Sequence, residues 1–412
     1  MLEYFIRRLL LTIPTFIGCT IVVYAIVSTA PGGPLDMQLQ ALKRGSGGET
    51  GTASNVQGQN IPPEAVEELK RFYNFDKPIP VQYMMWLGIM KRDAESFTLK
   101  PDEPRLVGNG IRIKAVAGNG GYTIVDADNP SQVLSDWLWE TKKMPSGEMK
   151  VRIFRQEYSG ILNGNFGTSY TYRKPVMELV QSRIPISTQF GIISLVLSYI
   201  VCVYLGIQKA LRHNSTFDFA SSTIVFIAYS VPGWALGAVL LVFFSTESFL
   251  PLFPLGGFED KMYSEFSFID KVIDRASHFV LPLIAYMIGG FATLTMLMKN
   301  SLLDNLSQDY IRTAFAKGIR EQRVIWLHAM RNSIIPIAAN MGYLIGVFLT
   351  GSYLIESVFG IDGIGKLSFE AVVARDYPIV FCFTVISVSV TLVGSILSDL
   401  ILSLVDPRIR FK

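Results

Sequence analysis

The sequence predicts an all-α polytopic membrane protein with six transmembrane helices. Half of its 412 residues are hydrophobic and 17% are charged, whereas soluble domains carry about 25% charged residues. The mean hydropathy is +0.35. A hydrocarbon layer about 30 Å thick requires about 20 apolar residues in a helix. Uncharged runs near this length cover residues 9–30, 186–208, 219–245, 279–298, 334–355 and 378–398.

The first run belongs to a first transmembrane helix at residues 1–30. Its basic start resembles that of a secretory signal, but its apolar stretch exceeds the about 7 to 15 residues of a signal peptide. We therefore expect it to be retained. Prolines lie within or at the ends of the runs, and we interpret them as kinks and span boundaries. They are Pro14, Pro185, Pro232, Pro282 and Pro336.

Basic residues predict the orientation, because short cytoplasmic loops collect Lys and Arg. If the runs alternate in direction, one side receives Arg7 and Arg8, Lys209 and Arg212, the basic segment 309–332, and the C-terminal Arg408, Arg410 and Lys412. Both termini are then cytoplasmic. Residues 31–185 form an extracytoplasmic segment, and residues 186–412 form a core of five helices.

The extracytoplasmic segment changes in composition along its length. Residues 44–60 are rich in Gly and Ser and predict a flexible linker. Residues 62–75, "PPEAVEELKRFYNF", predict a short amphipathic helix. From about 93 to 158, short runs such as "IRIKAV" and "MKVRIF" are broken by "GNGG" and "DNPS". This pattern of short runs separated by turn-forming residues predicts a small β-rich insertion.

Enzyme and metal chemistry are not indicated. The three histidines, His213, His278 and His328, do not have metal-ligand spacing, and all three cysteines lie in apolar runs. We therefore predict no catalytic, cofactor-binding or metal-binding residues. A net charge of +3 is too small to indicate nucleic-acid binding.

Ionisable residues are nearly missing from the interiors of the runs, which disfavours a carrier with a proton relay. Asp399 near the end of the last run is interpreted as an interfacial residue close to Arg408. The segment "GIDGIGKL", Gly360 to Leu367, fits seven positions of a P-loop. Leu367 replaces the Ser or Thr that holds magnesium, and neither the strand before nor the helix after is evident, so nucleotide binding is not expected.

The basic segment predicts a cytoplasmic helix-turn-helix. Asp309 suits the start of a helix, Lys317 its end, and Gly318 a stop. Ile311, Ala314 and Phe315 then share a face, and a second helix covers about Glu321 to Asn332. Its arginines at 312, 320, 323 and 331 suit a cytoplasmic loop or a lipid headgroup layer. Small residues at 313, 314 and 316 around one aromatic suit a protein partner instead, and the spacing alone leaves these alternatives open.

The segment "YIRTAFAKGIREQRVIWLHAMRNSIIP" resembles the cytoplasmic coupling loop of ABC importer permeases of the dipeptide and oligopeptide branch. The resemblance covers most of the chain. It extends to "YFIRRLLLTIPT", "APGGPLD", "FDKPIP", "NFGTSY", "LGIQKA", "IGGFATLTMLMKNSLLD", "LIESVFGIDGIG", "RDYPIV" and "LVDPRI". These resemble the B-type permease subunits of peptide importers, most of all those of peptide and microcin C importers.

Two features depart from the general pattern of the family. The general loop begins Glu-Ala-Ala, whereas Arg312, Thr313 and Ala314 stand here, followed by Gly318 at the matching distance. This is the variant of the peptide branch. The insertion at about 93–158 resembles nothing expected in this family.

The resemblance implies a type I ABC importer permease fold and ATP-driven import of peptides across the bacterial inner membrane. It implies that the coupling loop, residues 300–333, inserts a helix into an ATPase. The coupling residues carried over are Asp309, Tyr310, Ile311, Arg312, Thr313, Ala314, Phe315, Ala316, Lys317 and Gly318. We expect hydrophobic contact from Ile311 and Phe315 to supply most of the affinity.

The implied partners are a homologous C-type permease subunit, ABC ATPase subunits or a fused ATPase, an extracytoplasmic peptide-binding protein and membrane lipid, with no nucleic acid. ATP hydrolysis is expected on the separate ATPase, so the chain itself is not an enzyme and needs no cofactor. Two other functions remain open at the level of sequence. One is an ATP-independent channel or secondary carrier, and the other is a membrane-anchored receptor or assembly module.

Overall fold

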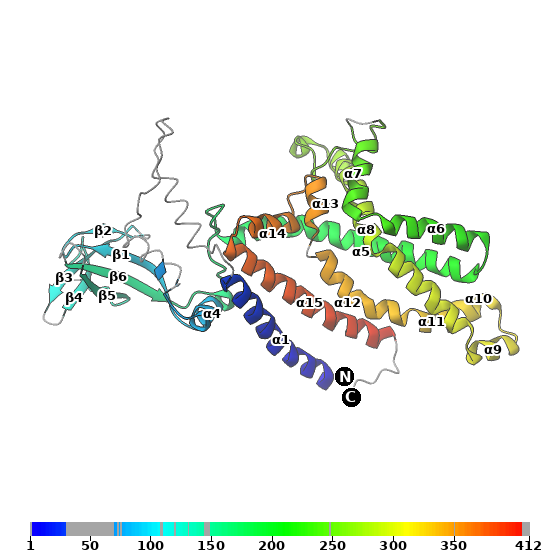
Figure 1. The fold of residues 1–412 in the computed structure, drawn as a ribbon, viewed down its shortest axis with the longest axis horizontal. Helices are drawn as coiled ribbons and strands as arrows, with labels where there is room; N and C mark the ends of the chain where they lie inside the picture. The colour runs from blue at the N-terminus through cyan, green and yellow to red at the C-terminus, as the bar shows by residue number, and fades with distance from the viewer. Residues whose placement is uncertain are drawn as a thin grey trace. The chain divides into compact units, whose positions relative to one another are not determined.

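A computed structural model describes residues 2–29, 70–71, 74, 76–107, 110–118, 121–130, 132–143, 149–246, 249–349 and 351–405. The chain divides into two compact units (Figure 1). One unit combines Met1–Val23 with Thr168–Lys412, and the other is Tyr24–Gly167. The predicted linker at 44–60, most of the predicted helix at 62–75, and the basic residues Arg408, Arg410 and Lys412 lie outside the described residues.

The first unit is helical. Its helices are α1 (Leu2–Thr29, whose last residues belong to the second unit), α5 (Val176–Leu211), α6 (Thr216–Ser230), α7 (Gly233–Phe244), α8 (Phe268–Leu306), α9 (Asp309–Ala316), α10 (Glu321–Arg323), α11 (Met330–Ser333), α12 (Ile335–Leu349), α13 (Tyr353–Val358), α14 (Ile364–Val373) and α15 (Tyr377–Val405). A π-helix, Val324–Ala329, joins α10 to α11, and a 3₁₀ turn covers Tyr263–Glu265.

Four helices are long and apolar enough to cross a membrane, namely α1, α5, α8 and α15, and a fifth span results if the bent pair α6 and α7 counts as one. Two of the six predicted runs therefore do not form a single membrane-spanning helix within the described residues. The run 219–245 bends by 97° between α6 and α7, because Val231 is extended and Pro232 has no N–H to continue the helix. The run 334–355 yields α12, which ends at Leu349 shortly before Gly351 with its φ of +76°.

Asp399 on α15 forms an ion pair with Arg8 on α1. The predicted neighbour of Asp399 was Arg408, which lies outside the described residues. Both partners of the observed pair are less than half exposed. The pair therefore joins the first and last helices of the chain near their apolar faces, where screening by water is reduced.

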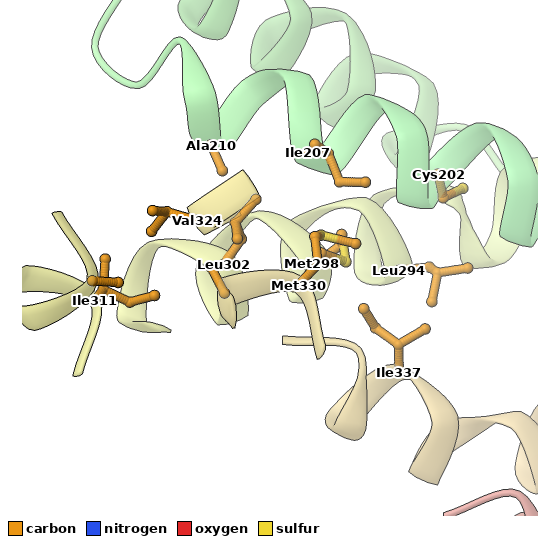
Figure 2. Packing of buried hydrophobic residues seen from close by; sticks show 12 residues of the cluster. Cys202, Ile207, Ala210, Leu294, Met298, Leu302, Ile311, Val324, Met330 and Ile337 are labelled. Atoms are coloured by element: carbon orange, nitrogen blue, oxygen red, sulfur yellow. The ribbon is translucent and has the colours of Figure 1, made fainter. Parts of the chain in front are cut away.

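Two apolar clusters hold the helical unit together. The first, called here the junction cluster, joins α5, α8, α9, the π-helix, α11 and α12. Figure 2 shows its side chains on α5 directed toward those on α8. Its members are Cys202, Ile207, Ala210, Leu294, Met298, Leu302, Ile311, Ala314, Val324, Ala329, Met330 and Ile337. In the second cluster, Phe190 of α5 stacks on Phe279 of α8 with ring centroids 4.1 Å apart.

Helices α12 and α15 touch through their backbones. A Cβ on Gly342 would lie 2.1 Å from the Gly394 carbonyl oxygen, and a Cβ on Gly394 would lie 2.5 Å from the Gly342 oxygen. Next to this crossing, Ser398 Oγ donates a hydrogen bond of 2.6 Å to the Ala339 carbonyl. Small residues let helices in a membrane approach closely and gain dispersion contacts.

Gly394→Ala should therefore destabilise the fold. The added methyl group overpacks the crossing, which costs about 1–3 kcal/mol, and we expect a lower midpoint of thermal unfolding in detergent. The matched control is Gly290→Ala on α8, where an added Cβ meets no atom within 4 Å. That control should unfold at or slightly above the parent midpoint, since Ala is the better helix former. Equal midpoints for the two variants would contradict the close crossing.

The second unit contains two three-stranded sheets with strand orders β1-β6-β5 and β2-β3-β4. All pairings are antiparallel. The strands are β1 (Arg92–Leu99), β2 (Arg105–Leu106), β3 (Arg112–Gly118), β4 (Gly121–Asp126), β5 (Trp137–Lys143) and β6 (Met149–Glu157). They lie in the interval for which the sequence predicted β structure. Their shared apolar core is Leu99, Val107, Ile113, Ala115, Ile124, Val151 and Ile153.

The chain enters and leaves these strands at one point. Helix α4 (Ile79–Leu87) ends at Gly88, and a 3₁₀ turn, Ile161–Asn163, follows Gly160. A Cβ on Gly160 would lie 2.3 Å from the Gly88 nitrogen, so the two backbones touch. Arg92 also donates to Ser159 Oγ over 2.9 Å. The six strands thus form a local unit whose two ends are held together.

Candidate functional site

Helix α9 is short because its two ends are set locally. It begins at Asp309, whose carboxylate suits the positive end of the helix, and Thr313 Oγ1 donates to the Asp309 carbonyl over 2.9 Å. It ends at Ala316, one residue before the predicted end. Gly318 has a φ of +71°, and its N–H donates to the Phe315 carbonyl over 2.9 Å. A left-handed residue here strongly favours glycine.

The inner face of α9 is buried in the chain's own core. Ile311 is 1% exposed and Ala314 is 7% exposed, and both belong to the junction cluster (Figure 2). Phe315 is 45% exposed. The face that the sequence predicts for Ile311, Ala314 and Phe315 is therefore divided in this structure, because the first two are buried within the chain and Phe315 is half exposed. Residues 311 and 314 lie on the stripe that faces α8 and the π-helix, and Phe315 lies at its edge.

Polar contacts fix α9 to the helices before and after it. Tyr310 Oη donates to Asn305 Oδ1 near the end of α8 over 2.8 Å, and Asn332 Nδ2 on α11 donates to Tyr310 Oη over 3.0 Å. The exposed pair Arg312 and Asp309, 3.5 Å apart, contributes little stability because both side chains are solvated. The position of α9 thus depends on the buried Ile311 and Ala314 and on Tyr310. Its other exposed side chains do not contribute to holding it in place.

The return segment differs from the single helix predicted over about Glu321 to Asn332. It consists of α10, the π-helix Val324–Ala329 and α11. Val324 and Ala329 are fully buried, whereas Trp326 and Leu327 are more than half exposed. A π-helix is rare and often occurs at functional sites. The extra residue per turn lets Val324 and Ala329 both reach the junction cluster, so Trp326 and Leu327 remain outside it.

The glycine-rich segment after α13 is a second notable site. Helix α14 begins at Ile364 inside this segment, although no helix is evident there from the sequence, and in the described residues α13 precedes the segment where a P-loop requires a strand. The Lys366 N–H donates to Glu356 Oε2 over 2.7 Å. The Ile364 N–H donates to Ser187 Oγ over 2.7 Å, and Ser187 Oγ donates to Glu356 Oε1 over 2.9 Å.

Glu356 therefore occupies the place that a phosphate takes in a P-loop. A helix N-terminus attracts anions, and here the anion is the chain's own carboxylate. Tyr286 Oη adds a bond of 3.3 Å to Glu356 Oε1 and accepts one of 3.1 Å from the Ser352 N–H. Glu356 is fully buried, and burial raises its pKa, while the donated hydrogen bonds act in the opposite direction. The donors that bind a phosphate in a P-loop are thus bonded here to side chains of the chain itself.

Sequence reasoning missed Glu356 and a second buried carboxylate, Asp218, which lies between two lysines. Their partners are distant in sequence: Ser187 precedes Glu356 by 169 positions, and Lys299 follows Asp218 by 81. One signal was present. Lys209, Asp218 and Lys299 each adjoin the end of a predicted run, so the alternating topology brings them to the same membrane boundary.

Comparison with known proteins gives the family. The model of the family described as "Binding-protein-dependent transport system inner membrane component" matches residues 202–411, half of the chain. The inner membrane ABC transporter permease YejB of Escherichia coli O157:H7 is 32% identical over 99% of each chain. The peptidoglycan transport system permease YejB of Agrobacterium fabrum is also 32% identical, over 99% of this chain and 98% of its own.

The oligopeptide transport system permease AppB of Bacillus subtilis is 28% identical over the full length of both chains. By name, all three relatives are permease proteins of transport systems. The chain accordingly belongs to the binding-protein-dependent inner membrane permeases, in the branch of peptide ABC transporters.

Proposed function

We propose that the chain is one of two homologous permease subunits of an ATP-driven peptide importer, the other being of the C type. Together they enclose the path, ABC ATPase subunits dock on α9 from the cytoplasm, and an extracytoplasmic binding protein delivers the peptide. Family membership and the names of the peptide permeases among the relatives support this assignment. The orientation that follows from the basic residues places both termini in the cytoplasm.

The observation that carries the proposal is the division of α9 into a buried and an exposed face. Ile311 and Ala314 are packed among residues of α5, α8 and α12, so a displacement of α9 moves these helices with it. Packed interfaces shift between discrete arrangements and do not deform continuously. When ATP draws two ATPase subunits together, α9 would carry that motion into the transmembrane helices.

The exposed face supplies the docking contact. Tyr310 and Phe315 are the large side chains exposed on α9, and Tyr310 is already bonded to Asn305 and Asn332. Phe315 therefore remains available, and the small residues Thr313 and Ala316 beside it let another backbone approach. A central aromatic in a desolvated pocket is the usual source of binding energy. Arg312 and Lys317 at the rim contribute mainly to the rate and orientation of docking. Phe315 therefore takes the role that the sequence assigned jointly to Ile311 and Phe315.

Crosslinking tests the docking face. In a chain without its native cysteines, Phe315→Cys should crosslink to a co-expressed ATPase, while Ala314→Cys, one residue away but buried, should not. Val133→Cys in the β unit, an exposed position, controls for orientation. A crosslink from position 133 to the ATPase, or none from position 315, would contradict the proposal.

Transport by the reconstituted complex tests the energy source. Peptide uptake into proteoliposomes should require ATP and should stop with an analogue that cannot be hydrolysed. Uptake that persists without any ATPase subunit would replace the proposal with an ATP-independent channel or carrier.

A further inference from the structure

Three helices of the permease meet at one buried carboxylate, Asp218, in the first turn of α6. Both oxygens of Asp218 lie 2.8 Å from Lys299 Nζ on α8. Lys209 Nζ, in the last turn of α5, lies 3.5 Å from Asp218 Oδ1. The Asn214 N–H donates to Asp218 Oδ2 over 3.2 Å, and His213 Nδ1 lies 3.3 Å from the same oxygen.

The two lysines have different partners and so different roles. Lys209 is fully buried and donates to three neutral oxygens of α6, the Asp218 carbonyl at 3.3 Å, Ser221 Oγ at 3.0 Å and Ser222 Oγ at 2.6 Å. Lys299 instead makes a forked contact with the Asp218 carboxylate. Lys209 therefore holds the start of α6 against α5, and Lys299 is the principal counter-ion of Asp218 and holds α6 against α8.

The junction cluster does not make the same connection, although Val225 on α6 is buried. The junction cluster ties α9 to α5, α8 and α12, and among the described residues it contains no member from α6. Large apolar residues of α6 such as Phe219, Ile224 and Ile227 are more than 60% exposed. Lys299 lies on α8 only ten positions before Asp309, where α9 begins. The Asp218–Lys299 contact is thus the polar link between α6 and the helix that leads into α9.

We infer that Asp218 and Lys299 are positioning residues that make α6 follow the movement of α9. The inference rests on the proposed function, in which α9 receives motion from an ATPase. A buried ion pair with two short bonds restricts both the distance and the orientation of the two side chains that it joins. Without it, α8 and α9 would still move, but α6 would follow incompletely. ATP hydrolysis would then be less well coupled to peptide movement.

The experiment uses the full complex of both permeases, the ATPases and the binding protein in proteoliposomes. Lys299→Met keeps the length of the side chain and removes its charge, and Asp218 retains Lys209 as a counter-ion. We expect assembly and ATP hydrolysis to persist, and peptide transported per ATP hydrolysed to fall about tenfold, a usual size for coupling between sites. Lys299→Arg, which retains two donors for the carboxylate, should restore most of this ratio. Lys271→Met, on the same helix but outside the cluster, is the control and should leave the ratio unchanged.

A parental ratio in Lys299→Met would overturn the inference, as would the same loss in Lys299→Arg. If the complex with Lys299→Met does not assemble, peptide transported per ATP hydrolysed is measured in the charge-balanced double variant Asp218→Asn with Lys299→Met. If neither variant assembles, the two residues have a purely structural role and the inference is overturned. The parent complex separates this inference from the function on which it rests. A parent whose transport does not depend on ATP refutes the proposed function, whereas a coupled parent with a coupled Lys299→Met variant refutes only the positioning role.

Discussion

Glu356→Ala is expected to cost several kcal/mol and to leave little folded permease. The substitution removes the acceptor of Ser187 Oγ, Tyr286 Oη and the Lys366 N–H at once. Each buried donor left without an acceptor costs about 1–3 kcal/mol, and the missing side chain also leaves a cavity. Size-exclusion chromatography in detergent, followed by thermal unfolding of whatever elutes as a single species, measures the loss.

The control is Glu370→Ala on α14, the helix whose N-terminus Glu356 caps. Glu370 accepts one bond of 3.0 Å from Tyr172 Oη at an exposed position, so its removal should change the free energy of unfolding by less than about 0.5 kcal/mol. Glu356→Gln should fall between the two. Its amide oxygen can still accept from the two hydroxyl groups, but its NH₂ group meets the Lys366 N–H. If Glu356→Ala is as stable as Glu370→Ala, the carboxylate is not the element that joins these helices.

The glycines around Glu356 explain why the loss cannot be relieved by a shift of the backbone. A Cβ on Gly351 would lie 2.5 Å from Glu356 Oε1, and a Cβ on Gly363 would lie 2.6 Å from Glu356 Cδ. Gly351 also has a φ of +76°, which disfavours other residues. The backbone is therefore shaped around this one carboxylate, and Gly363, which belongs to the segment that resembles a P-loop, lies against it.

Hydropathy predicted the long helices because they need only local information. Each of α1, α5, α8 and α15 contains an uncharged run about as long as a bilayer is thick. Hydropathy does not detect a change in the direction of the chain, so the predicted run 219–245 joined α6 and α7 across a bend of 97°. Pro232 marked the position of that bend, but a proline at a span boundary does not specify an angle.

The ends of α9 were predictable and its orientation was not. Gly318 and Asp309 mark the ends through their own backbone preferences. Ile311 and Phe315 lie one turn apart, so periodicity places both near the same face. Only the positions of α8 and the π-helix determine that Ile311 points inward and Phe315 outward. The ion cluster at Asp218 and the carboxylate of Glu356 were missed for a related reason, since their partners lie 81 and 169 positions away.

Ile311→Ala and Phe315→Ala should fail in different ways although they lie on adjacent turns of α9. Ile311→Ala leaves a cavity in the junction cluster and should cost about 2–5 kcal/mol of stability. The midpoint of thermal unfolding should fall, and ATPase binding should weaken because α9 loses its fixed position. Unfolding in detergent, together with binding of the purified ATPase to permease in nanodiscs, measures both effects.

Phe315→Ala should instead leave the unfolding midpoint near that of the parent, because its half-exposed ring contributes little to the core. Loss of an interface anchor of this kind costs at least about 2 kcal/mol of binding free energy, which is a decrease in affinity of more than about tenfold. A drop in stability for Phe315→Ala with unchanged ATPase affinity would mean that the ring packs on its own chain. The exposed face of α9 would then have no anchor, and the ATPase would have to be held by another surface.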